Sequence, residues 1–132
     1  MNNKIEKNKS TRALKSYKYT SAILAFILWS VWAYFINIES DNNMVSAFAQ
    51  GASSFFITLM MIKLIEFFYN FFPKNRWFFI LPSIVTVGLT SSFVVFIHMW
   101  IDTANIFFTV LPTVMVSFLF ALYTTRKFKR IT

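Results

Sequence analysis

The chain has 132 residues and a net charge of +8, and 57% of its residues are hydrophobic while only 14% are charged. A domain of this length cannot bury so much apolar surface, which excludes an ordinary water-soluble fold. Cysteine is absent, which excludes disulfides, thiolate catalysis and cysteine-based metal sites.

The chain begins with a basic segment, residues 1–17, which has too few apolar side chains to fold on its own. Residues 1–18 hold six cations, and Glu6 is the only acid among them. Such a segment can contact anionic lipid head groups, each nearby cation contributing about 1 kcal/mol. Because the segment is short and adjoins an apolar stretch, we do not expect it to bind nucleic acid.

Four stretches without a charged residue follow, each 20 to 25 residues long. A helix of about 20 apolar residues crosses a hydrocarbon core of roughly 30 Å, and a backbone in hydrocarbon must satisfy its own hydrogen bonds. We therefore predict an all-α membrane protein. Its transmembrane domain, residues 18–125, is expected to hold four helices, over about 18–38, 44–70, 77–101 and 103–125, and a basic tail follows at 126–132.

The distribution of charge predicts the orientation of these helices. Cations gather in the first segment, in the tail and in the connection that holds Lys74 and Arg76, whereas the other two connections hold only Glu39, Asp41 and Asp102. Cations favour the cytoplasmic side of a membrane. We expect two hairpins with both termini in the cytoplasm, in a multi-pass protein of the bacterial inner membrane.

Small residues suggest where the helices pack. Ala47 and Gly51 are four residues apart in the second stretch, as are Gly88 and Ser92 in the third. Small residues at this spacing let helix backbones approach closely in a membrane. We expect the second and third helices to touch there.

Two prolines fall inside the predicted third and fourth helices. Pro82 and Pro112 each remove a backbone donor, and Pro112 leaves the carbonyl of Phe108 without its helical partner. A neighbouring helix can supply the missing donor. Both prolines are expected to kink their helices, either as static bends or as hinges.

Polar side chains within the apolar stretches are the candidate functional residues, because each must be compensated in the membrane. His98 and Asp102 would share one face of a continuous helix near the outer head groups. They either anchor and cap the helices or form a pH-sensitive or head-group-binding site. Gln50 either bonds to a neighbouring helix or lines an outward-facing ligand pocket with His98, Asp102 and Asn105. One histidine and one aspartate are too few ligands for a metal.

A charged pair is expected where the second helix reaches the inner boundary of the membrane. Lys63 and Glu66 are three residues apart, so they lie on one helix face and can form an ion pair. The aliphatic stem of the lysine can extend its ammonium group toward water.

The sequence contains no recognisable set of catalytic residues. It has a single histidine and only two glycines, so a glycine-rich phosphate loop is absent, and we expect neither catalysis nor a cofactor or metal. The leading hypothesis is a non-catalytic protein of envelope biogenesis that binds membrane lipids or a partner membrane protein. The alternative is a small transporter or channel made of several copies of this chain.

Overall fold

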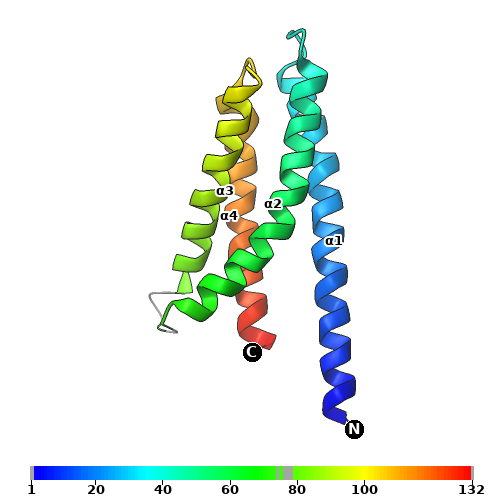
Figure 1. Ribbon diagram of the computed structural model, residues 1–132, viewed down its shortest axis with the longest axis vertical. Helices are drawn as coiled ribbons and strands as arrows, with labels where there is room; N and C mark the ends of the chain where they lie inside the picture. Colours follow the sequence, from blue (N-terminus) through cyan, green and yellow to red (C-terminus); the bar gives the residue numbers. More distant parts are fainter. Residues whose placement is uncertain (1, 74, 76–78, 132) are drawn as a thin grey trace.

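The computed structural model describes residues 2–73, 75 and 79–131, and within them the chain folds entirely as α-helix and turns. The prediction of an all-α protein is confirmed: 88% of the structure is helix and the described residues form no strand. Four helices long and apolar enough to cross a membrane lie within this described part. They are α1 (Asn2–Ile36), α2 (Asn43–Phe71), α3 (Leu81–Trp100) and α4 (Ile106–Ile131) (Figure 1).

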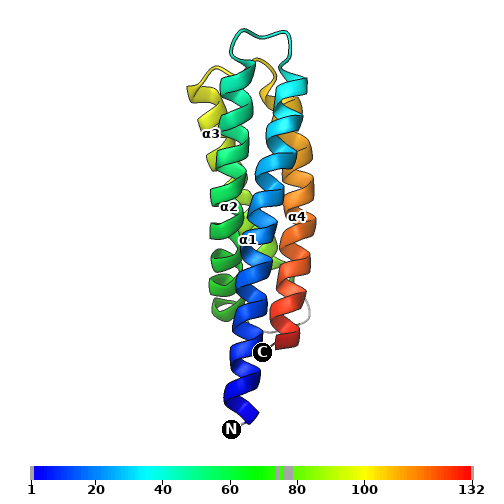
Figure 2. The same cartoon turned by 90° about the vertical axis from the view of Figure 1, so that its right-hand side faces the viewer.

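The helices run up and down as neighbours in one bundle. Both chain termini lie at the same end, which we call the terminal end, and the α1–α2 and α3–α4 connections lie at the opposite, or turn, end (Figures 1 and 2). The first helix projects beyond the others at the terminal end (Figure 2). The cations Lys74 and Arg76, on which part of the predicted orientation rests, lie outside the described residues.

The basic segment at the start of the chain is helical, as a continuation of the first apolar span and not as a fold of its own. α1 begins at Asn2 and passes residue 17 without a break. Forming a helix is costly only for its first turn, so the apolar span can nucleate a helix that the segment then extends one hydrogen bond at a time. Lysine, arginine and glutamate are also good helix formers. The basic tail extends α4 in the same way.

The two prolines have different places in their helices. Pro82 occupies the first turn of α3, where a missing N–H costs nothing, so this proline begins the helix. The prediction that Pro82 kinks α3 is therefore wrong. Pro112 lies inside α4. The carbonyl of Phe108, four residues earlier, accepts a hydrogen bond of 3.1 Å from Trp32 Nε1 of α1.

Gly51 of α2 packs against α1, and not against α3 as predicted. A methyl group added at Gly51 would overlap Ser30 Oγ and lie 3.0 Å from the carbonyl oxygen of Phe26. By contrast, a methyl group at Gly88 would meet nothing within 4 Å, and Ser92 is exposed. Spacing alone shows that two backbones can approach, but it does not show which helix is the neighbour. The apolar core of α2, α3 and α4 instead centres on larger side chains such as Ile57, Ile65, Val87, Val94 and Val110.

Candidate functional site

A buried network of side-chain hydrogen bonds joins α2, α3 and α4 near the turn end. His98 Nδ1 lies 2.7 Å from Thr103 Oγ1, and His98 Nε2 donates to Gln50 Oε1, which can only accept. Thr103 Oγ1 also lies 3.2 Å from Ser46 Oγ, and Gln50 Nε2 donates to Thr113 Oγ1 at 2.9 Å. All five side chains are buried, so this polar network is shielded from the surroundings of the bundle.

A second group of amides and hydroxyls joins the end of α1 to the start of α4. Asn37 Nδ2 donates to Thr109 Oγ1 at 3.0 Å, and Asn37 Oδ1 accepts from the backbone N–H of Asn105 at 3.1 Å. Asn105 Nδ2 in turn donates to the carbonyl of Ile36. Asn37 was not among the predicted site residues, although its place at the end of an apolar stretch is the signal that could have identified it.

The four residues predicted to line one outward-facing pocket are not brought together. Gln50 and His98 contact each other, but neither has any exposed surface. Asp102 is exposed, lies beyond the end of α3 and has a φ of 53°, so it is not one helical turn from His98 on a shared face. Nor does it begin α4, which starts at Ile106, and the exposed side chain of Asn105 bonds to the end of α1.

The predicted charged pair on α2 does not form an ion pair in the described part of the structure, where Lys63 and Glu66 are both exposed. That part also contains no group of three histidine, cysteine, aspartate or glutamate residues that could hold a metal ion.

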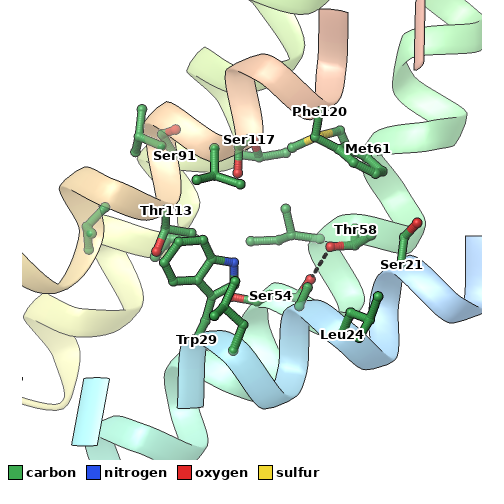
Figure 3. Close-up of a pocket in the computed structure, with 18 residues that line it drawn as sticks. Ser21, Leu24, Trp29, Ser54, Thr58, Met61, Ser91, Thr113, Ser117 and Phe120 are labelled. Atoms are coloured by element: carbon green, nitrogen blue, oxygen red, sulfur yellow. Dashed lines mark hydrogen bonds between the residues drawn. The ribbon is translucent and has the colours of Figure 1, made fainter. Parts of the chain in front are cut away.

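Between the polar network and the terminal end lies a cavity of about 240 Å³. All four helices contribute to its wall, and Figure 3 shows Trp29 of α1, Met61 of α2, Ser91 of α3 and Phe120 of α4 around it. The wall is mainly apolar, although seven of its eighteen lining residues are serine or threonine. Such a composition is typical of sites that bind apolar ligands and orient them with a small number of polar contacts.

The cavity opens sideways, between α1 and α4. Of the residues that line it, Leu24 and Leu28 of α1 are 61% and 55% exposed, and Val116 of α4 is 44% exposed. The lining residues of α2 and α3 are buried or half-buried. We call this mouth the lateral opening, and in a bilayer it would face the lipid hydrocarbon.

Two contacts between α1 and α4 bound the lateral opening. Toward the turn end, Trp32 Nε1 bonds to the carbonyl of Phe108. Toward the terminal end, the hydroxyl of Tyr17 lies 2.8 Å from Thr124 Oγ1. The cavity-lining residues of α1 run from Ser21 to Trp29, a rise of about 12 Å of helix, so the opening lies between these two contacts.

One buried hydroxyl in the cavity wall has no hydrogen-bond partner among the described residues. Ser54 Oγ is buried and unpaired, although the backbone carbonyl of Ser54 accepts a bond of 2.6 Å from Thr58 Oγ1 (Figure 3). The hydroxyl of Thr90 is satisfied by its own helix. The cavity therefore offers a ligand a mainly apolar volume with a small number of hydroxyl groups at its wall.

Comparisons of the chain with known protein families, with curated proteins and with solved structures found no match in any of the three. The geometry of the network and the cavity is thus the basis for any functional conclusion.

Proposed function

We propose that this chain is a non-catalytic, multi-pass protein of the bacterial inner membrane that binds a membrane lipid by taking part of an acyl chain into the cavity. Its terminal end would face the cytoplasm, which is supported by the cations of both chain ends and by the acids Glu39, Asp41 and Asp102 in the two connections at the turn end. A protein of this kind would serve envelope biogenesis as a lipid-binding subunit or helper.

The lateral opening is the observation that carries this proposal. A cavity of 150 Å³ lined by apolar side chains is enough to hold benzene, whereas sites for whole drug-sized ligands measure about 300–1,000 Å³. At about 240 Å³, this cavity has room for a segment of a longer apolar molecule. Because the mouth faces sideways, the remainder of that molecule could stay in the bilayer, as the rest of a lipid would.

The polar network supports a binding role more than a transporting one. Gln50 bonds to His98 and to Thr113, and Thr113 also lines the cavity. Buried polar groups that are paired in this way resist rearrangement. A transporter or channel built from several copies of this chain is the alternative. Absence of solute or ion flux in liposomes, together with retention of lipid, would support the binding role.

Filling the cavity should remove bound lipid. Ser117 lines the cavity on α4, whereas Ser92 is exposed on α3. Ser117→Phe therefore fills the cavity, and Ser92→Phe makes the same chemical change outside it. We expect native mass spectrometry in mild detergent to show about tenfold weaker lipid binding for Ser117→Phe, equivalent to about 1.4 kcal/mol, and unchanged binding for Ser92→Phe.

A second variant protects this test against misfolding. Ala25→Leu fills the cavity from α1 by a smaller volume and should weaken binding in the same direction. Thermal unfolding would identify any variant that fails to fold. Lipid retention equal to that of the unmodified protein in a folded Ser117→Phe or Ala25→Leu variant would contradict the proposal.

A further inference from the structure

The rim of the cavity at the terminal end leads to a cation through a continuous series of contacts. Phe120 lines the cavity, and its ring stacks on that of Tyr17 with 5.8 Å between centroids and 12° between planes. The hydroxyl of Tyr17 bonds to Thr124. Lys127 Nζ lies 3.8 Å from the centroid of the same tyrosine ring. An apolar volume and a positive charge are therefore neighbours across two stacked aromatic side chains, Phe120 and Tyr17.

The charge of Lys127 is not neutralised by a carboxylate. Within residues 2–73, 75 and 79–131, no carboxylate forms an ion pair with Lys127. Its ammonium group instead makes a cation–π contact with the ring of Tyr17. Three of the five acids of the chain, Glu39, Asp41 and Asp102, lie in connections at the turn end. A cation at the membrane surface contributes about 1 kcal/mol to the binding of anionic lipid. The contact with the aromatic ring also restricts the conformations of the Lys127 side chain.

The distances suit a lipid whose head group lies beside Lys127. From Thr124 to Ser117 the helix rises by about 10 Å at 1.5 Å per residue. The hydrocarbon of one leaflet is roughly 15 Å thick, half of a core of about 30 Å. An acyl chain that starts at the level of Thr124 thus reaches Ser117 and extends to about Val114, and both residues line the cavity.

We infer that the bound lipid is an anionic phospholipid of the leaflet at the terminal end, with its phosphate at Lys127 and one acyl chain in the cavity. This inference rests on the proposed lipid-binding function and specifies the class of lipid. The phosphate would accept hydrogen bonds from the lysine ammonium group, while Tyr17 and Phe120 would separate the head group from the apolar interior. A soluble phosphate compound would use the cation but leave the adjoining cavity without a role.

Two lysines of α4 allow a matched test. Lys127 lies over Tyr17 beside the cavity rim, whereas Lys129 Nζ lies 5.4 Å from the centroid of the Phe79 ring. Lys127→Gln and Lys129→Gln therefore remove the same charge from the same helix at different places. The full chain is presented with equal amounts of dioleoyl phosphatidylglycerol and dioleoyl phosphatidylcholine, which carry the same acyl chains and differ in net charge, and bound lipids are counted by native mass spectrometry.

We expect the unmodified protein and Lys129→Gln to prefer the anionic lipid by about fivefold, the change that about 1 kcal/mol produces. Lys127→Gln should bind both lipids about equally, and Ser117→Phe should lose both. If Lys127→Gln keeps the preference, or if Lys129→Gln loses it to the same degree, the inference is overturned while lipid binding in the cavity stands. If Ser117→Phe keeps both lipids, the proposed function itself fails.

Discussion

Gln50 illustrates how a single polar residue can organise this bundle. Its carbonyl oxygen accepts from His98 of α3, and its amide nitrogen donates to Thr113 of α4. Side-chain hydrogen bonds between membrane helices contribute about 0.6 kcal/mol on average and up to about 1.7 kcal/mol. Two such bonds stabilise the contact of three helices by about 1–3 kcal/mol, so the amide favours one arrangement of the helices over others that leave it unpaired.

The two glycines should respond oppositely to the same substitution. Gly51→Ala places a methyl group against Ser30 and the carbonyl of Phe26, and overpacking of this kind costs about 1–3 kcal/mol. Gly88→Ala meets open space and should stabilise α3 by about 0.5–1 kcal/mol, the usual advantage of alanine within a helix. Reversible unfolding in detergent with increasing dodecyl sulfate measures both free energies.

A third variant shows whether the loss at Gly51 comes from this contact. Ser30→Ala removes the hydroxyl that the new methyl group would overlap, so Gly51→Ala should cost less in a Ser30→Ala background. Equal costs in both backgrounds would contradict the close approach of α1 and α2 at this point.

The sequence predicts which polar residues need compensation, but not their partners. Gln50 and His98 stand out because each is a strongly polar group in a long apolar stretch. Thr103 and Thr113 do not, because a threonine can satisfy its hydroxyl on its own helix and is common in such stretches. The turn after α3 also reverses the chain at Asp102, which places Thr103 and not Asp102 beside the imidazole. Local geometry of this kind is not visible in residue spacing.

At the scale of one helix, Pro112 links the backbone of α4 to α1. Because proline has no N–H, the carbonyl of Phe108 is available to Trp32 Nε1, and their bond is one boundary of the lateral opening. Pro112→Ala would restore an intrahelical donor that competes with the indole. The proline therefore makes a specific contact between helices possible, in addition to any effect on the shape of α4.

A double-mutant cycle tests this coupling. Trp32→Phe removes the indole donor and should lower the free energy of unfolding by about 0.6–1.7 kcal/mol. In a Pro112→Ala background, Trp32→Phe should change the free energy of unfolding much less, because the carbonyl of Phe108 then has a hydrogen-bond partner within α4. Unfolding free energies of the four proteins give the coupling energy. Independent, additive effects of the two substitutions would show that the Trp32–Phe108 bond does not depend on Pro112.

Over the whole molecule, the number of long apolar helices followed from sequence, whereas the neighbours of each helix did not. A run of about 20 uncharged, apolar residues has few alternatives to a helix in hydrocarbon, so length and charge were sufficient. Contacts between helices depend on which faces meet. Gly51 has the same small-residue spacing as Gly88, yet one is packed against α1 and the other is open. The cavity could not be predicted for the same reason, since it exists only where four imperfectly matched faces surround a space.

The proposed orientation can be tested on the intact bundle, because the chain has no cysteine of its own. Asp41 and Ala104 are exposed in the two connections at the turn end, and Lys4 is exposed near the amino terminus. With cations held in the cytoplasm, a membrane-impermeant maleimide should label Asp41→Cys and Ala104→Cys in spheroplasts, but Lys4→Cys only after the membrane is permeabilised. Labelling of all three in detergent controls for reactivity. Labelling of Lys4→Cys in sealed cells would show that the orientation is the reverse of the one proposed. Lys127, and the anionic lipid inferred to bind there, would then belong to the outer leaflet. Labelling of Asp41→Cys and Ala104→Cys from different sides would instead mean that the four helices do not all cross the membrane.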